Sequence, residues 1–288
     1  MLGRVLRFIR CRTAIAYLAT FGGEEQGGCW AFPPLLARAA LNVARRFSTC
    51  AAAPPPLAIP RMSDFPLIIF DLDGTLVDTA PDLISALNWV LAREGLAPVP
   101  LESARKMIGQ GARRLIERGL EAEGREMGVA DVTRLTSDFI DYYAEHIADD
   151  SRPFDGLIAA LDEMEASGHR FAVCTNKLEW LSRRLLEQLE LTSRFAAICG
   201  ADTFGVSKPD PVILQQTVAK AGGRMSSVVM VGDAGPDIGV ARRAGVPVIG
   251  VEFGYTDVPI ADLKPDLLIG HFRDLPAAVS RLLPGKSS

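Results

Sequence analysis

The chain of 288 residues allows one large domain or two of ordinary size, because domains usually contain about 100–200 residues. Hydrophobic residues make up 48% of the sequence and charged residues 23%, which excludes charge-rich, intrinsically disordered protein. The formal net charge of −4 is unevenly distributed, since residues 1–61 carry +6 and the other 227 residues carry −10. This acidic body argues against a nucleic-acid partner, because phosphates are bound by clustered positive charge.

Residues 1–61 form a basic segment with eight arginines, no lysine and two glutamates. Arg4, Arg7 and Arg10 recur every three residues between apolar residues, which on a helix gives a basic face beside an apolar one, as in an organellar transit peptide. The apolar run at residues 13–23 is shorter than the roughly 20 residues that span a bilayer, so we expect no membrane span. Three interpretations stay open: an extension without function ahead of Met62, a targeting peptide, or a docking segment. We expect a cytoplasmic protein, or an organellar one if this segment is a transit peptide.

From residue 62 onward, short runs rich in Val and Ile alternate with helical patterns. Uninterrupted apolar runs of this kind are typical of strands buried on both faces of a parallel sheet. They cover residues 67–70, 171–174, 196–199, 228–231, 246–251 and 267–269. The helical patterns cover residues 157–167, 178–189, 211–221, 236–244 and 275–283. This alternation predicts an α/β fold with a doubly wound parallel sheet.

The alternation is interrupted once, by residues 79–151. This segment has no strand pattern, and its helical patterns cover residues 83–93, 101–108, 112–120 and 132–147. We therefore predict a separate α-helical domain inserted into a core made of residues 62–78 and 152–288. The run RPFDG at residues 152–156 has the turn-forming composition of a hinge.

Acidic residues follow the first predicted strand in the run DLDGTLVD, residues 71–78. Chemistry in an open α/β sheet takes place beyond the carboxyl ends of the strands. Asp71 and Asp73, two residues apart at such an end, suit a nucleophile and a proton donor beside a cation. The alternative is an ordinary Asp-Gly turn with solvated acids. Matching groups at three further strand ends argue against that alternative.

These further groups occur in chain order after the second, third and fourth predicted strands. They are Thr175 with Asn176, Lys208, and Asp233 with Asp237. A hydroxyl, backbone N–H groups and a lysine suit phosphate, and carboxylates suit Mg²⁺. Each of these groups alone is weak evidence for a phosphate site. All of them in this order, each after a strand, form a specific pattern.

The ordered motifs identify the chain as similar to the haloacid dehalogenase superfamily of phosphatases with a helical cap. The resemblance covers about residues 63–285 and includes all four motifs. Within the superfamily, the chain looks most like the phosphoglycolate phosphatase group. This narrower likeness rests on DLDGTLVDT at residues 71–79, IGQGA at 108–112 and VEFGY at 251–255. It also rests on the pair Pro265-Asp266 ahead of the last strand.

The resemblance implies a role for each acidic residue. Asp71 would attack phosphorus and form an aspartyl-phosphate, and Asp73 would protonate the leaving group and later deprotonate water. Mg²⁺ would be held by the Asp71 carboxylate, the Asp73 backbone carbonyl and Asp233. Asp237 would serve as a further ligand or would support one. The reaction expected is hydrolysis of a small phosphorylated metabolite, with 2-phosphoglycolate as the leading substrate.

The remaining motif residues would bind the phosphoryl group. Thr175, Asn176 and Lys208 would clamp it during transfer. One departure from the pattern is Ala234, where close relatives often carry a hydroxyl residue. This puts one supporting hydrogen bond in doubt and leaves the metal site intact.

The inserted segment is expected to select the substrate. Gly109 and Gly111 in the run GQGARR, residues 109–114, would present backbone N–H groups to a small carboxylate. Arg113 or Arg114 would bind that carboxylate across the closed interface, and the sequence does not separate the two. The competing interpretation is a plain turn between helices with solvated arginines.

Several other functions share parts of this pattern. A dehalogenase is disfavoured, because halide departure needs neither the Asp73 proton nor Mg²⁺. Other capped phosphatases acting on sugar phosphates, or a phosphomutase, stay open, and release of free phosphate separates the mutase. A non-catalytic binding protein on this fold is disfavoured because all four motifs are complete. The sequence leaves a monomer and a homodimer equally open.

Overall fold

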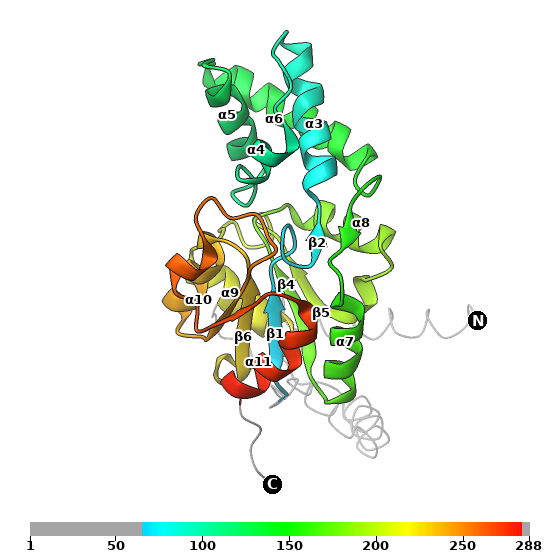
Figure 1. Ribbon diagram of the computed structural model, residues 1–288, viewed down its shortest axis with the longest axis vertical. Helices are drawn as coiled ribbons and strands as arrows, with labels where there is room; N and C mark the ends of the chain where they lie inside the picture. The colour runs from blue at the N-terminus through cyan, green and yellow to red at the C-terminus, as the bar shows by residue number, and fades with distance from the viewer. Residues whose placement is uncertain (1–64, 284–288) are drawn as a thin grey trace, which may run out of the picture. The chain divides into compact units, whose positions relative to one another are not determined.

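The computed structural model describes residues 65–283 (Figure 1), so the expectations for residues 1–61 lie outside the described part of the chain. A six-stranded sheet has the order β5-β4-β1-β6-β7-β8, and each neighbouring pair is parallel. The strands are β1 (Leu67–Phe70), β4 (Arg170–Cys174), β5 (Phe195–Cys199), β6 (Val228–Gly232), β7 (Val248–Val251) and β8 (Leu267–Ile269). The first strand in the sequence therefore lies in the interior of the sheet, between β4 and β6.

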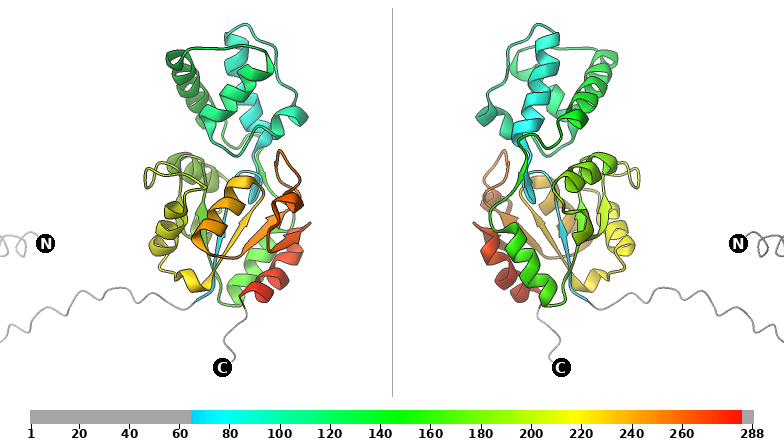
Figure 2. Two further views of the ribbon diagram at one scale, coloured as in Figure 1. Left: turned by 90° about the vertical axis from the view of Figure 1, so that its left-hand side faces the viewer. Right: turned by 90° about the vertical axis from the view of Figure 1, so that its right-hand side faces the viewer.

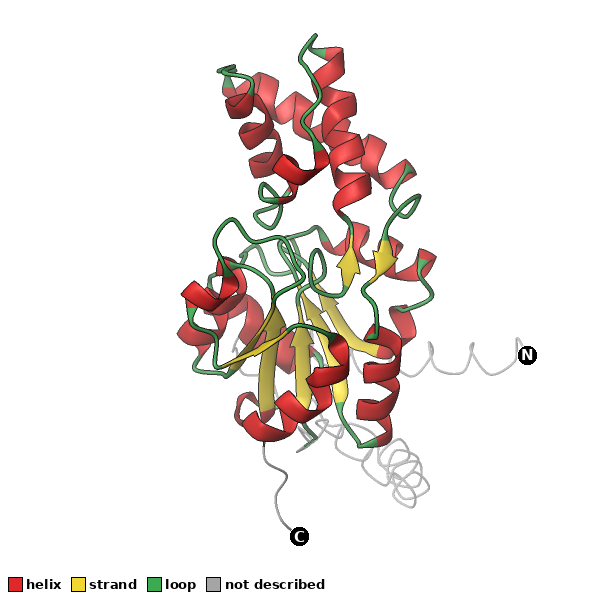
Figure 3. Cartoon of the chain, viewed as in Figure 1, coloured by secondary structure: helices red, strands yellow, loops and turns green. Residues whose placement is uncertain are grey.

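Helices cover both faces of this sheet (Figure 3). Successive residues of β1 point to opposite faces, so Ile68 and Phe70 join one apolar core while Leu67 and Ile69 join the other. The first core is completed by α7 (Leu157–Ala166), α8 (Glu179–Gln188) and α11 (Leu275–Leu282). The second is completed by α9 (Pro211–Lys220) and α10 (Gly235–Ala244). The predicted doubly wound α/β sheet is confirmed.

Four helices within residues 79–151 form the inserted segment. They are α3 (Ala80–Arg93), α4 (Leu101–Arg105), α5 (Ala112–Ala122) and α6 (Val129–Glu145). They lie beyond the carboxyl ends of the strands, on the side where β1 leads into α3 (Figure 2). No helix between residues 65 and 283 has both the length and the apolar character needed to cross a membrane.

The two connections between the sheet and these helices run side by side. Strands β2 (Val77–Asp78) and β3 (Arg152–Pro153) pair antiparallel. At the base of α3, the Asp82 carboxylate accepts hydrogen bonds from the backbone N–H groups of Asp150 and Ser151 and from the Ser151 hydroxyl. The inserted segment is thus tied at both ends to one narrow ribbon.

The observed elements differ from the sequence expectations in a few places. The β2–β3 ribbon was not predicted, because two residues per strand are too few to show a period of two. The strand expected at residues 246–251 begins at Val248, after Pro247, which has no N–H to donate to a neighbouring strand. The helix expected at 101–108 ends at Arg105, and the chain then turns through Gly109, whose φ is +107°.

Replacing Phe70 with Ala should destabilise the fold strongly. Its side chain is fully buried and meets the Phe171 ring edge-on, with centroids 5.9 Å apart. We expect a loss of about 3–5 kcal/mol in the free energy of unfolding, measured by urea denaturation, because the substitution leaves a cavity. Val129→Ala is the control, since Val129 is 74% exposed, and it should change stability by about 0.5 kcal/mol or less. Equal effects of the two substitutions would contradict the assigned core.

Candidate active site

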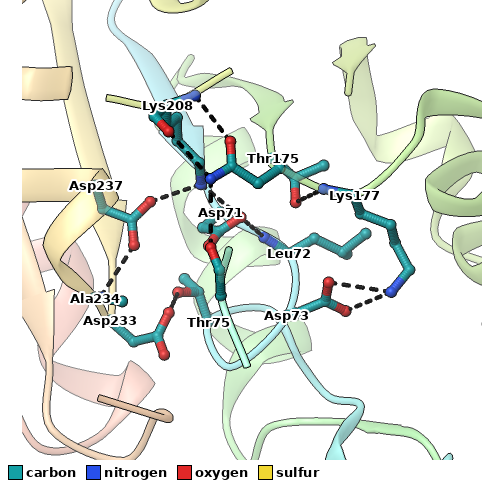
Figure 4. Close-up of polar contacts among 12 residues, drawn as sticks. Asp71, Leu72, Asp73, Thr75, Thr175, Lys177, Lys208, Asp233, Ala234 and Asp237 are labelled. Atoms are coloured by element: carbon teal, nitrogen blue, oxygen red, sulfur yellow. Dashed lines mark hydrogen bonds and ion pairs between the residues drawn. The ribbon is translucent and has the colours of Figure 1, made fainter. Parts of the chain in front are cut away.

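Three neighbouring strands bring the predicted site residues together. Asp71 directly follows β1, Thr175 follows β4 and Asp233 follows β6. Because β1 pairs with both other strands in parallel, their carboxyl ends lie at the same edge of the sheet. The loop after β5 contributes Lys208, and the first turns of α10 contribute Asp237. Five residues from four separate segments of the sequence therefore meet in one buried cluster (Figure 4).

The Asp71 carboxylate is fixed through one of its two oxygens. Oδ1 accepts a hydrogen bond of 2.7 Å from the backbone N–H of Leu72 and lies 2.8 Å from the Lys208 ammonium. Among residues 65–283, no hydrogen bond to Oδ2 is present. The side chain is 6% exposed. One oxygen is thus held in place and the other is left for chemistry.

Lys208 is the central cation of the cluster. Its Nζ lies 2.8 Å from Asp71 Oδ1 and 2.7 Å from Asp237 Oδ1, and its side chain is 1% exposed. The second oxygen of Asp237 accepts a hydrogen bond of 3.0 Å from the backbone N–H of Ala234. Burial alone would lower the pKa of Lys208, but attraction to Asp237 and Asp71 outweighs it and raises the pKa. Lys208 therefore stays charged.

Asp233 completes a group of three buried carboxylates. Its Oδ1 accepts a hydrogen bond of 2.9 Å from the Thr75 hydroxyl, and its Oδ2 accepts one of 2.7 Å from the backbone N–H of Tyr255. One oxygen each from Asp71, Asp233 and Asp237 lies within 4.8 Å of the others. Burial raises the pKa of Asp71 to about 7 and that of Asp233 to about 8, and the repulsion between the carboxylates adds to this. Hard oxygen donors at this spacing fit Mg²⁺, which would relieve the repulsion.

Gly74 allows the Asp71 loop to approach Asp233. Its φ is +82°, and a Cβ added there would lie 2.4 Å from Asp233 Oδ2. The backbone N–H of Gly74 donates to the carbonyl of Val77 at 3.0 Å, which closes the turn. Only glycine satisfies both the left-handed backbone and the close contact.

Asp73 lies beside the cluster and has partners of its own. Its carboxylate accepts hydrogen bonds from the Thr79 hydroxyl at 2.8 Å and from Lys177 Nζ at 2.8 and 3.1 Å. Figure 4 shows Lys177 reaching Asp73 from the side opposite Lys208. Lys177 was not predicted from the sequence, although it directly follows Thr175 and Asn176. Thr75 and Tyr255 were also not predicted, since neither residue type signals a carboxylate support.

Asn176 connects two loops through its side-chain amide. The amide oxygen accepts from the backbone N–H of Lys208 at 2.8 Å, and Nδ2 donates to the carbonyls of Lys208 and Gly109 at 3.2 and 3.3 Å. The Asn176 side chain therefore positions Lys208 and the inserted segment. Thr175 is buried, and its hydroxyl oxygen accepts from the backbone N–H of Lys177 at 3.2 Å.

A cavity of about 270 Å³ lies between the cluster and the inserted helices. Asp71 and Asp73 line it from the core, and Gly109, Gly111 and Arg113 line it from the inserted segment. Most of its other lining side chains are apolar. Both glycines and one of the two arginines expected to bind the substrate therefore reach this cavity.

The two candidate arginines differ in their placement. Arg113 lines the cavity, but its Nε lies 3.0 Å from Glu117 Oε1 and its side chain is 48% exposed. Arg114 lies 2.7 Å from Glu121 and does not line the cavity. The structure thus favours Arg113 of the two, although its charge already has a partner.

A family model described as haloacid dehalogenase-like hydrolase matches residues 68–251. The chain belongs to this family. Among curated proteins, a phosphoglycolate phosphatase of Agrobacterium fabrum is 48% identical over 223 residues, which cover 77% of this chain and 96% of that protein. One of Mesorhizobium japonicum is 45% identical over 218 residues, covering 76% of this chain and 96% of that protein.

Solved structures agree with this family. A crystal structure of a predicted phosphoglycolate phosphatase from Haemophilus somnus has a TM-score of 0.69 and 29% identity, and it covers 75% of this chain and 99% of that one. This haloacid dehalogenase-like hydrolase is a phosphatase, and the Asp71 cluster is its candidate active site.

Mg²⁺ should stabilise this hydrolase more at high pH than at low pH. Unfolded aspartates titrate near ~3.9, whereas Asp71 and Asp233 titrate at about 7 and about 8 in the fold. The folded state therefore binds more protons across this window, so stability in EDTA should fall as pH rises through it. Mg²⁺ competes with protons for the same oxygens. The increase in Tm on adding MgCl₂ should thus be larger at about pH 8 than at about pH 5.5.

Asp233→Asn should remove most of this increase in Tm. Asp162→Asn should keep the increase in Tm, because the Asp162 side chain is 64% exposed and does not belong to the cluster of three buried carboxylates. An increase in Tm that does not depend on pH, or one that persists in Asp233→Asn, would contradict the assigned metal site.

Proposed function

We propose that this phosphatase is a Mg²⁺-dependent hydrolase that converts 2-phosphoglycolate and water to glycolate and phosphate through an aspartyl-phosphate on Asp71. The observation that carries the proposal is the Asp71 carboxylate, held through Oδ1 by Lys208 and Leu72. A carboxylate fixed in this way presents its second oxygen in one direction, which suits in-line attack on phosphorus.

In the first half of the reaction, Asp71 Oδ2 forms a bond to phosphorus and the bond from phosphorus to the ester oxygen breaks. The electron pair stays on the departing oxygen, and Asp73 donates a proton to it. Thr79 and Lys177 hold the Asp73 carboxylate by hydrogen bonds of 2.8 Å. These contacts fix the direction from which the proton is delivered.

In the second half, a water oxygen attacks phosphorus while Asp73 accepts a proton from it. The bond from phosphorus to Asp71 breaks, and the carboxylate is regenerated. Two displacements replace one very slow one.

The phosphoryl group requires positive charge and donors, because it is anionic and approaches an anionic carboxylate. Lys208 supplies a buried charge, and Thr175 supplies a hydroxyl and nearby backbone N–H groups. Asn176 contributes by fixing the Lys208 backbone, to which its amide is bonded at 2.8 and 3.2 Å.

Mg²⁺ would be held by the carboxylates of Asp71 and Asp233 and by the Asp73 backbone carbonyl. Asp237 would ligate it or support a ligand, since its carboxylate belongs to the same group within 4.8 Å. When bound, the ion would neutralise charge between Asp71 and the phosphate.

Two observations support 2-phosphoglycolate as the substrate. Relatives at up to 48% identity are phosphoglycolate phosphatases, and the apolar cavity walls favour a short leaving group over a polyhydroxylated one. Each hydroxyl left without a partner in such a cavity would cost about 1–3 kcal/mol. We also propose that residues 79–151 act as the cap domain that covers this cavity.

Asp71→Asn should abolish hydrolysis while leaving the fold intact. An amide cannot form the acyl phosphate, so we expect kcat below about one-hundredth of the wild-type value, measured by phosphate release. Circular dichroism checks the fold, and Asp162→Asn serves as the matched surface control. Turnover above that level, with mass spectrometry excluding deamidation, would contradict the role of Asp71.

A panel of phosphate esters tests the substrate. We expect kcat/KM for 2-phosphoglycolate to exceed that for hexose phosphates by about tenfold or more, since even one unpaired hydroxyl costs that much. Free phosphate is measured directly, so that transfer to a sugar is distinguished from hydrolysis. Hexose phosphates ranking well above 2-phosphoglycolate would overturn the substrate assignment and leave the phosphatase assignment standing.

A further inference from the structure

Tyr143 on α6 carries a buried hydroxyl that has no hydrogen-bond partner within the described part of the chain. The side chain is 0% exposed, and its hydroxyl makes no hydrogen bond with any residue from 65 to 283. Tyr143 lines the same cavity as Asp71 and Asp73. Burying a hydroxyl without a partner is unfavourable, so such groups usually meet a ligand or water. An unpaired donor on a residue that lines this cavity therefore points to a group on the substrate.

Lys177 adds a positive charge over the Tyr143 ring. Its Nζ lies 4.5 Å from the centroid of the Tyr143 ring, and its side chain is 5% exposed. The ring is held in place by stacking on Phe139, with centroids 6.0 Å apart. Burial raises the pKa of Tyr143 to about 12, so the hydroxyl keeps its proton. Tyr143 and Lys177 together offer one neutral donor and one cation.

The position of this pair follows from its contact with Asp73. Lys177 Nζ is 2.8 Å from Asp73 Oδ1, and Asp73 is the group that protonates the ester oxygen in the proposed reaction. In 2-phosphoglycolate, one methylene carbon separates the ester oxygen from the carboxylate. A substrate carboxylate would therefore lie beside the same ammonium group when the ester oxygen faces Asp73.

We infer that Tyr143 and Lys177 form the subsite that binds a carboxylate on the leaving group and so determines specificity. The inference rests on the proposed function, and it assigns the binding group for the substrate's acid end. Apolar walls from Leu83, Phe139 and Leu181 line the same cavity. Beside these walls, Tyr143 and Lys177 offer a compact anion both a hydrogen bond and a positive charge.

This assignment differs from the one expected from the sequence. Arg113 or Arg114 was expected to bind the carboxylate. Lys177 is paired with Asp73 at 2.8 Å and Arg113 with Glu117 at 3.0 Å, so these two cations differ in burial and not in having a partner. Arg113 also donates to the Thr133 hydroxyl at 3.3 Å. Half of its side chain is exposed, so its charge is screened by solvent. Tyr143 and Lys177 are buried, where the same contact with an anion is stronger.

The test compares two substrates that differ only at the acid end. They are 2-phosphoglycolate and 2-hydroxyethyl phosphate, in which a hydroxymethyl group replaces the carboxylate. The measured quantity is the ratio of kcat/KM for the first to kcat/KM for the second. Tyr143→Phe should lower this ratio by about tenfold or more, because a hydrogen bond to a charged group is lost.

Two control variants accompany it. Tyr142→Phe changes the neighbouring tyrosine, whose ring stacks on Trp89 at 4.6 Å outside the cavity lining, and it should leave the ratio unchanged. Arg113→Ala should lower the ratio by less than about threefold, since this charge is solvent-exposed.

Stability separates a binding role from a structural one. Removing an unpartnered hydroxyl should leave the Tm of Tyr143→Phe at or above the wild-type value. A lower Tm together with an unchanged ratio would show that the hydroxyl supports the fold, and would overturn the inference. Lys177→Gln should reduce turnover of both substrates through Asp73, and it should reduce turnover of 2-phosphoglycolate further.

The remaining outcomes are also decisive. If Tyr143→Phe retains the kcat/KM ratio and Arg113→Ala loses it, Arg113 and not Tyr143 binds the substrate carboxylate. In that case the proposed function would stand and only the subsite would be wrong. A wild-type protein that does not prefer 2-phosphoglycolate to 2-hydroxyethyl phosphate would instead refute the substrate assignment itself.

Discussion

The active site depends on one buried ammonium group held between two carboxylates. Lys208 lies within 2.8 Å of both Asp71 and Asp237 and is almost completely shielded from water. A buried charge is tolerated only when its partners are close and fully hydrogen-bonded. The loop after β5, the turn after β1 and the start of α10 therefore have to meet at this point. The requirement for charge balance thus fixes the position of Asp71.

The same need for charge balance explains why the cluster of three carboxylates suits a cation. Lys208 balances only part of the negative charge of Asp71, Asp233 and Asp237. Burial, with the remaining repulsion between carboxylates added to it, raises the pKa of Asp71 and of Asp233. A divalent cation would supply what is missing. Lys177 forms a second buried ion pair, with Asp73. Asp71 and Asp73 thus each have a buried lysine partner, and we assign Lys208 to the phosphoryl group and Lys177 to the leaving group.

Much of the fold and of the catalytic cluster was predictable from the sequence. Buried parallel strands are uninterrupted apolar runs, so β1 and β8 were predicted to the residue, and the motif residues Asp71, Lys208 and Asp233 followed from their places after strands. Side-chain pairing was not predictable in the same way. Tyr143 has the appearance of a core residue on an amphipathic helix, and its unpaired hydroxyl becomes evident only when α6 is packed over Lys177.

The central claim is that Asp71 takes the phosphoryl group before water does. The most direct test is the stereochemical course of hydrolysis, using a phosphate ester made chiral at phosphorus with oxygen isotopes and labelled water. Two successive in-line displacements, the first by Asp71 and the second by water, predict net retention of configuration at phosphorus. Net inversion would mean that water attacks the ester directly, and it would contradict the account.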